Sequence, residues 1–460
     1  MSDEAGAPAA DAAADRGPDP LLPGHGDLAF GVEHYDLDLR YSLDGNHLAG
    51  RAVLDVLVAR HTRRLRLDLH TLAASKVVLT GARLRRWAAR RGRLVLTLAD
   101  EAAPGTRLQV RVTYGGVPRP VTGPDGEAGW EELADGVIVA SQPHGAPSWF
   151  PCNDRPSDKA TYRIAVTTAS DYTVVANGRL VERRARASRT TWVYAADAPM
   201  ATYLATVQIG RYVTRSLDGA GVPMTLTHPA RLRAAVAAGF ARQAEMVRTF
   251  ERLFGPYPFD RYAVVVTDDV LEIPLESQGL STFGANHART SWDAQRLVAH
   301  ELSHQWFGNS LTLARWRDIW LHEGFACYAE WLWSEHSGGP PAADHAQRHW
   351  RRLSRAPQDL VLADPSAEEM FDDRVYKRGA LLLHALRLTV GDEDFFGLLR
   401  AWVAEHRHGS VTTEMFTAFA RECTGRDLDD LFTAWLHRGR LPELLGEGRR
   451  RPLFGSPPRW

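Results

Sequence analysis

The first half of the chain alternates between polar and apolar side chains over short stretches. In residues 34–41 (H-Y-D-L-D-L-R-Y), apolar side chains occupy every second position, which is the period of a strand with one buried face. Similar stretches, separated by turn residues, recur at 48–58, 65–69, 94–98, 107–114, 137–139, 162–168, 172–175, 190–194 and 203–209. The pattern therefore predicts an antiparallel β domain over residues 27–226.

The hydrophobic period changes near residue 228. Residues 229–254 carry apolar side chains at helical spacing, and Gly255 and Pro256 predict the end of that helix. A short β-branched strand at 262–266 is followed by helical patterns at 292–307, 318–334, 344–354, 374–390, 392–406, 413–424 and 428–438. We therefore expect an α+β protein in which residues 227–445 form a mainly α-helical domain.

The two ends of the chain differ from the rest in composition. Residues 1–26 are rich in Ala, Asp, Pro and Gly, which is typical of a disordered leader, and residues 446–460 are rich in Arg, Pro and Gly, which predicts a flexible tail. The N-terminus lacks the basic region and the apolar run of a secretory signal, and no apolar run reaches the length of a membrane span. We therefore expect a cytoplasmic protein that does not act at a membrane.

Composition narrows the class of protein further. The chain has 460 residues, 24% of them charged, and a formal net charge of -1, so no global field favours nucleic acid as a partner. Its three cysteines, Cys152, Cys327 and Cys423, are an odd number without C-x-x-C spacing. This favours free thiols in a reducing compartment over a disulfide framework. The oligomeric state stays open.

Residues 300–304 read H-E-L-S-H within a predicted helix. His300 and His304 are four residues apart, so both imidazoles lie on one helix face, and Glu301 beside them can reach a metal-bound water. Eighteen residues separate His304 from Glu323, which lies in the segment W-L-H-E-G-F-A, and this is enough chain for a helix to end and a third ligand to return. A surface helix with two solvated histidines is the alternative, and the distal glutamate in an aromatic-rich helix argues against it. We expect one catalytic zinc ion held by His300, His304 and Glu323, with Glu301 as the general base.

The stretch from His300 to Glu330 resembles the aminopeptidase N family of zinc metallopeptidases (the gluzincin clan), residue type by residue type. The resemblance covers residues 34–442. It implies a saddle-like N-terminal β domain, then a thermolysin-like catalytic domain, and an activity that removes N-terminal residues from peptides with a free N-terminus. Larger members of the family carry a further helical domain, which we expect to be absent from this chain.

The resemblance assigns three more site residues. The segment I-P-L-E-S is similar to the family's G-A-M-E-N, and Glu276 falls on the glutamate that binds the free amine, although the Gly and Asn are missing. The segment V-Y-K-R-G resembles Y-E-K-G, so Tyr376 falls on the tyrosine whose hydroxyl stabilises the tetrahedral intermediate, with Lys377 in place of Glu. Gln142 matches a glutamine of the first substrate pocket, and His144 occupies the second polar position there. Taken alone, Gln142 is equally well explained as a turn residue.

Two acidic residues near the motif have two explanations each. Glu330 follows Glu323 by seven residues, which is two turns along the same helix face. It either orients a ligand histidine or forms a surface ion pair, and Asp318 has the same two explanations.

The sequence therefore predicts a zinc-dependent aminopeptidase that acts on peptides by metal-activated water. A thermolysin-like endopeptidase and a catalytically silent scaffold member of the same family remain alternatives. The preferred N-terminal residue and the limit on substrate length are not predicted.

Overall fold

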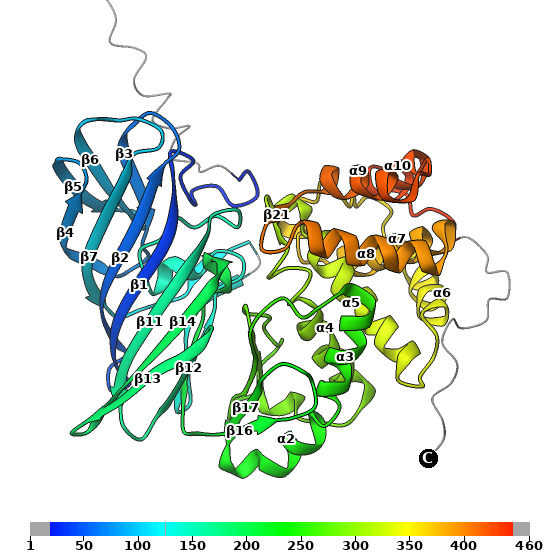
Figure 1. Ribbon diagram of the computed structural model, residues 1–460, viewed down its shortest axis with the longest axis horizontal. Helices are drawn as coiled ribbons and strands as arrows, with labels where there is room; N and C mark the ends of the chain where they lie inside the picture. The colour runs from blue at the N-terminus through cyan, green and yellow to red at the C-terminus, as the bar shows by residue number, and fades with distance from the viewer. Residues whose placement is uncertain (1–18, 125, 445–460) are drawn as a thin grey trace, which may run out of the picture.

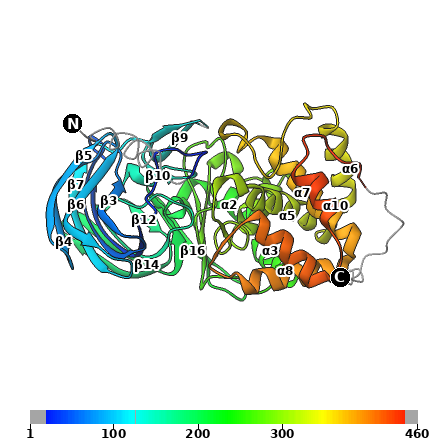
Figure 2. The same ribbon diagram turned by 90° about the horizontal axis from the view of Figure 1, so that it is seen from above.

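The computed structural model describes residues 19–124 and 126–444. A β-rich half and a helix-rich half lie side by side (Figures 1 and 2). Most of the predicted leader, residues 1–18, and the predicted tail, residues 446–460, lie outside the described residues. No helix in the described part is long and apolar enough to cross a membrane.

Three sheets form the described part of the β-rich half. The largest has the order β13 (Arg179–Arg186), β14 (Arg189–Ala201), β11 (Lys159–Ala169), β1 (Phe30–Ser42), β2 (His47–Val58), β7 (Arg107–Gly116) and β4 (Ala73–Thr80). The second has the order β12 (Thr173–Ala176), β15 (Val207–Gly210), β10 (Gly136–Ala140), β9 (Gly126–Leu133) and β8 (Val121–Gly123), and the third β3 (Thr62–Asp68), β6 (Arg93–Ala102) and β5 (Leu84–Arg90). All neighbouring strands in these sheets are antiparallel except β1 and β11, which are parallel.

The predicted alternation is present in β1. Tyr35, Leu37 and Leu39 are buried, while the charged side chains between them are partly or fully exposed. Strand β13 was not predicted, because every residue of R-L-V-E-R-R-A-R is exposed at the sheet edge and no apolar face exists to produce a period. The predicted strand at 203–209 is shorter than expected, because Thr202–Leu204 forms a 3-10 turn before β15.

The helix-rich half contains a four-stranded sheet of β16 (Tyr212–Leu217), β17 (Met224–Pro229), β18 (Tyr262–Val266) and β19 (Leu280–Phe283), of which the last three are parallel. Its α-helices are α2 (Arg233–Gly239), α3 (Gln243–Phe254), α4 (Trp292–Ser303), α5 (Trp320–His336), α6 (Ala342–Leu353), α7 (Asp373–Val390), α8 (Asp392–Glu405), α9 (Thr413–Thr424) and α10 (Asp429–Leu436). Two short strands, β20 (Thr312–Leu313) and β21 (Ser410–Val411), pair in parallel. Strand β17 crosses the predicted boundary at residues 226 and 227, and the domain limits stay a prediction.

Two predicted helices have different limits in the structure. The helix expected over 229–254 is divided into α2, which ends at Gly239, and α3, which begins at Gln243, and it starts only at Arg233, after a 3-10 turn. Helix α4 ends at Ser303, four residues earlier than expected. The chain turns there, and the carbonyl of His304 accepts a hydrogen bond from the backbone nitrogen of Asn309 at 2.9 Å.

The two halves are tied together by partly buried polar contacts. Nζ of Lys159 on β11 donates hydrogen bonds to the carbonyls of Asn309 and Ser310 at 3.1 and 2.9 Å, directly after the metal-motif helix. The described end of the predicted leader, residues 19–26, also packs here, because the carboxylate of Asp19 accepts a hydrogen bond of 2.8 Å from the backbone nitrogen of Trp316. These contacts fix the β-rich half against the loop that follows α4.

Helices α5 and α7 cross in backbone contact. A Cβ added to Gly324 would lie 2.8 Å from Cα of Gly379, and a Cβ added to Gly379 would lie 2.7 Å from Cα of Gly324. Real side-chain carbons do not approach so closely, so only glycine fits at both positions. The crossing therefore sets the distance between the residues beside it, Glu323 on α5 and Tyr376 on α7.

We expect Gly379→Ala to destabilise the protein by about 1–3 kcal/mol, because the added methyl group must push α7 away from α5. Catalytic turnover should fall as well, since α7 carries Tyr376 into the site. Gly397→Ala in α8 is the matched control, because its Cβ would meet no atom within 4 Å and the change should stabilise the helix by up to about 1 kcal/mol. Urea unfolding measures the free energy of unfolding of both variants. Equal stability of the two would contradict the inference that the contact between α5 and α7 requires glycine.

Candidate active site

Two histidines and one glutamate face one another in the helix-rich half. His300 lies in the last turn of α4, His304 directly follows that helix, and Glu323 lies in the first turn of α5. Oε2 of Glu323 is 3.3 Å from Nε2 of His300 and 3.6 Å from Nε2 of His304. The three potential ligand atoms lie within 4.8 Å of one another on buried side chains. Within the described residues, this is the one group of three or more His, Cys, Asp or Glu side chains that could hold a metal ion.

The other ring nitrogen of each histidine is already engaged. Nδ1 of His300 is 2.8 Å from Oε1 of Glu330. Nδ1 of His304 is 3.0 Å from the carbonyl oxygen of Phe307. A proton on each Nδ1 satisfies these acceptors and leaves each Nε2 lone pair directed toward Glu323. Two imidazole nitrogens and one carboxylate oxygen in this arrangement fit zinc.

Opposite charges balance one another within the buried cluster. Burial lowers the pKa of His300, but its hydrogen bonds with Glu323 and Glu330 outweigh burial and raise that pKa to about 10. Burial alone would raise the pKa of Glu323, and the charges of the two histidines instead hold it well below its usual range. Burial raises the pKa of Glu301 to about 8 and also raises the pKa of Glu276. A bound cation would stabilise the charged forms of Glu323, Glu301 and Glu276.

The cluster opens onto a cavity of about 540 Å³. The predicted site residues that line it are His300, Glu301, His304, Glu323, Glu330, Tyr376, Glu276 and Gln142. Elements from both halves of the molecule therefore meet at one cavity, since Gln142 follows β10 and the others belong to the helix-rich half.

Glu276 enters the cavity from the segment before β19 and is 8% exposed. Its backbone carbonyl accepts a hydrogen bond of 2.7 Å from Nδ2 of Asn309. Gln305 holds the next residues: its Oε1 accepts from the backbone nitrogen of Gly279 at 2.8 Å, and its Nε2 donates to the carbonyl of Ser277 at 3.3 Å. The residues that directly follow H-E-L-S-H therefore fix the position of Glu276, even though the expected Gly and Asn are missing from its own segment.

Tyr376 lies in the first turn of α7, and its ring is nearly parallel to that of His300, with centroids 6.2 Å apart and an interplanar angle of 19°. Burial raises the pKa of the phenol well above its usual range, and the charges of Glu323, Glu276 and Glu301 add to this. The hydroxyl therefore keeps its proton near neutral pH and can donate a hydrogen bond into the cavity.

Gln142 and His144 have different surroundings. Nε2 of Gln142 is buried and has no hydrogen-bond partner within the described residues, which leaves this amide available to a ligand in the cavity. His144 does not line the cavity. Its ring stacks on that of His25 with centroids 5.4 Å apart, inside the β-rich half. The substitution at position 144 therefore lies away from the metal cluster.

The two ambiguous acidic residues occupy different places. Glu330 is buried and lies against His300, and its Oε2 is 3.3 Å from Nη1 of Arg296. Oδ1 of Asp318 accepts hydrogen bonds from the backbone nitrogen and the hydroxyl of Thr413, at 3.1 and 2.7 Å. Asp318 thus joins the start of α5 to the start of α9, and it does not line the cavity.

Several residues that line the cavity were not predicted from the sequence. Arg296 and Leu297 precede His300 by four and three residues, so helical periodicity would have placed them on its face. His345, Arg348, His349 and Arg352 come from α6, and no local sequence signal connects that helix with the metal motif.

Comparisons with known proteins give one consistent result. The family model of the peptidase M1 N-terminal domain matches residues 32–204, and the model of the peptidase family M1 domain matches residues 239–435. The crystal structure of an M1 zinc metallopeptidase from Deinococcus radiodurans is similar, with 33% identity, a TM-score of 0.86, and coverage of 93% of this chain and 98% of that chain. A mutant of that enzyme, bound to a Tyr-Ser-Ala substrate, matches with a TM-score of 0.85 and 33% identity.

Curated relatives are more distant and longer. Aminopeptidase M1 of Arabidopsis thaliana is 27% identical over 340 residues, which are 66% of this chain and 37% of that protein. Glutamyl aminopeptidase of Bos taurus is 27% identical over 339 residues, which are 66% of this chain and 34% of that protein. The chain thus spans little more than a third of the length of these relatives. Together with the solved structures, they confirm the predicted resemblance, the fold class and a zinc cofactor.

Removal of zinc should lower the thermal stability of the protein, because a ligand present at a thousand times its dissociation constant stabilises the folded state by about 4 kcal/mol. We expect one zinc ion per chain by elemental analysis, and none in Glu323→Ala. Calorimetry with and without a chelator measures the stability change.

Two further variants distinguish an acidic residue that contacts a candidate metal ligand from one that does not. Glu330→Gln should keep zinc but weaken its affinity about ten- to a hundredfold, because the hydrogen bond to His300 loses its charge. Asp318→Asn should leave zinc affinity unchanged, since Asp318 contacts Thr413 and not a ligand. Equal zinc affinities for these two variants would contradict this arrangement.

Proposed function

The chain belongs to peptidase family M1, and from this premise we propose that it is a zinc-dependent aminopeptidase that hydrolyses N-terminal residues from peptides with a free N-terminus. One observation carries the proposal: the cluster of His300, His304 and Glu323 shares a cavity with the buried carboxylate of Glu276. The cluster supports hydrolysis, and the separate carboxylate supports recognition of an amine.

Zinc held by His300, His304 and Glu323 would polarise the peptide carbonyl and make a water molecule acidic enough to attack it near neutral pH. Glu301 lines the same cavity and adjoins the ligand His300 in the chain, so its carboxylate is placed to accept a proton from the attacking water. It then returns that proton to the departing amine. This is the role of Glu301 in the proposal.

The Tyr376 hydroxyl donates a hydrogen bond to the oxygen on which negative charge develops. Two observations support this role: the ring stands beside the ring of His300, and burial keeps the phenol protonated. The rigid crossing of α5 and α7 holds the donor in place before reaction, which is what stabilisation of a developing oxyanion requires.

Glu276 binds the free amine of the substrate, and Gln142 contacts the first residue. A buried carboxylate binds an ammonium group strongly, because the charge-assisted hydrogen bond forms out of water. The free Nε2 donor of Gln142 supports a contact with substrate rather than a role in a turn alone.

We also propose that the enzyme works in the cytoplasm on free peptides, in peptide catabolism. Its three cysteines, two of them buried, are all free thiols in the structure, which suits a reducing compartment.

Replacement of Glu301 by Gln should leave zinc binding intact and lower kcat on an aminoacyl amide reporter about 10²- to 10⁴-fold, the usual contribution of a general base. Glu422→Gln, on the exposed face of α9, is the matched control and should behave as the parent enzyme. Retained activity in Glu301→Gln would contradict its assignment as the base. A zinc-loaded parent enzyme that turns over no aminoacyl reporter would instead indicate a silent scaffold.

Blocking the N-terminus of a peptide should abolish its cleavage, because an acetylated nitrogen carries no charge for Glu276 to bind. For free peptides, Glu276→Gln should lower kcat/KM about ten- to a hundredfold, which corresponds to the loss of one charge-assisted hydrogen bond. Peptide mapping by mass spectrometry measures both effects. Equal cleavage of acetylated and free peptides, or cleavage at internal bonds, would indicate an endopeptidase.

A further inference from the structure

Helix α6 and the turn directly after it present a row of arginines beside the active-site cavity. The arginine face, as we call it, consists of Arg348, Arg351, Arg352 and Arg355, and all four side chains are exposed. We propose that the arginine face binds a carboxylate on the leaving-group side of the scissile bond and so makes the enzyme prefer acidic peptides. This inference rests on the proposed aminopeptidase function and names a substrate class for it.

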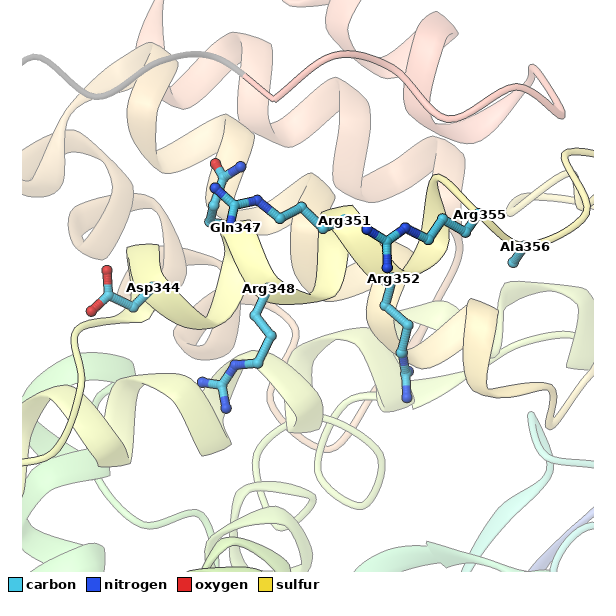
Figure 3. A pocket seen from close by; sticks show the side chains of 7 residues that line it. All are labelled: Asp344, Gln347, Arg348, Arg351, Arg352, Arg355 and Ala356. Atoms are coloured by element: carbon cyan, nitrogen blue, oxygen red, sulfur yellow. The ribbon is translucent and has the colours of Figure 1, made fainter.

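The arginine face borders two hollows that share Arg348 and Arg352 as lining residues. An outer hollow of about 800 Å³ is lined by all four arginines together with Asp344, Gln347 and Ala356. Arg348 and Arg352 also line the cavity that contains the metal cluster. Figure 3 shows these two side chains on one side of α6, with Gln347 and Arg351 on the other side. Arg348 and Arg352 therefore border both the active-site cavity and the outer hollow.

Little negative charge compensates the arginine face. Arg352 pairs with Asp373 on α7, and that pair is about half exposed. Among the residues that the structure describes, the side chain of Arg348 forms a hydrogen bond with a histidine and no salt bridge, with Nη2 2.9 Å from Nδ1 of His345. Burial lowers the pKa of His345, so this partner is neutral near pH 7 and does not balance the guanidinium charge.

The remaining members of the face are also uncompensated. Arg351 and Arg355 have no salt bridge within the part of the chain that the structure describes, and Asp344 lies at the other end of α6. The net charge of the whole chain is only -1, so this positive region is local and lies beside the cavity rather than being a general property of the protein.

The direction of the substrate follows from burial. Glu276, which holds the free amine in the proposed function, is 8% exposed and lines the cavity, whereas the side chains of the arginine face are exposed. A peptide held by its amine at Glu276 must extend toward the open side, so the arginines meet residues that follow the scissile bond. The planar guanidinium groups suit carboxylates, which they bind with two parallel hydrogen bonds.

Acidic side chains and the C-terminal carboxylate of a short peptide offer the same chemistry, and a peptide panel distinguishes them. The first arm uses C-terminally amidated alanine pentapeptides with Asp or Asn at positions two to five. The second arm compares free acids with amides of alanine peptides of two to five residues. The measured quantity is kcat/KM for release of the first residue by the zinc-loaded full-length enzyme.

We expect at least one Asp peptide, or one free acid, to exceed its neutral partner in kcat/KM by about threefold to tenfold, the range for exposed charges screened by solvent. The ratio of kcat/KM for the charged peptide to kcat/KM for its neutral partner should fall toward one in Arg348→Gln and in 0.5 M salt. It should drop below one in Arg348→Glu. Arg86→Gln, in the exposed strand β5 of the other half, is the matched control for loss of one positive charge and should keep the parent ratio.

The possible failures are distinct. Normal turnover of neutral peptides with ratios of one in both arms would overturn the arginine-face proposal and leave the aminopeptidase function standing. A preference for carboxylates that persists in Arg348→Gln and in the Arg348→Gln/Arg352→Gln double variant would also overturn it. No release of an N-terminal residue from any peptide would overturn the aminopeptidase function and this inference together.

Discussion

The backbone contact between Gly324 and Gly379 is the constraint on which the geometry of the site depends. It brings α5 and α7 closer than any side chain would allow, one residue after Glu323 and three residues after Tyr376. Glu323 and Tyr376 therefore reach the cavity from two helices whose separation is set by this backbone contact. Close packing transmits any change at the crossing directly to the distance between these two groups.

The site also depends on balanced buried charge. Glu323 stands between two histidines, Glu330 engages the far side of His300, and Glu301 and Glu276 face the same space. Buried carboxylates are costly unless cations or hydrogen bonds compensate them. A zinc ion held by His300, His304 and Glu323 would supply that compensation, so we expect metal binding and stability to be linked in this protein. The arginine face of α6 continues the same principle outward, with positive charge placed where a substrate carboxylate would complete the balance.

Much of the site was predictable because its signals are local. The spacing of His300 and His304 follows from one helical turn, and the α+β order follows from a change in hydrophobic period along the chain. From the sequence, Glu330 and Asp318 each had two explanations: contact with a ligand histidine, or a surface ion pair. The structure separates them, because Glu330 faces His300 from the same side of α5 as Glu323, whereas Asp318 lies before that helix and turns toward Thr413. Strand β13 escaped prediction because a fully exposed edge strand has no buried face to reveal it.

The sequence by itself predicted the candidate ligands His300, His304 and Glu323, the metal and the class of fold, because these are encoded in short spacings and in periodicity. Tertiary structure alone decided what surrounds the metal. The support of Glu276 by Gln305 and Asn309, the contact of α5 with α7 and the position of the arginines of α6 all join segments far apart in the chain. Such contacts depend on which elements pack together, and the hydrophobic period of an element shows its buried face without showing which partner covers it.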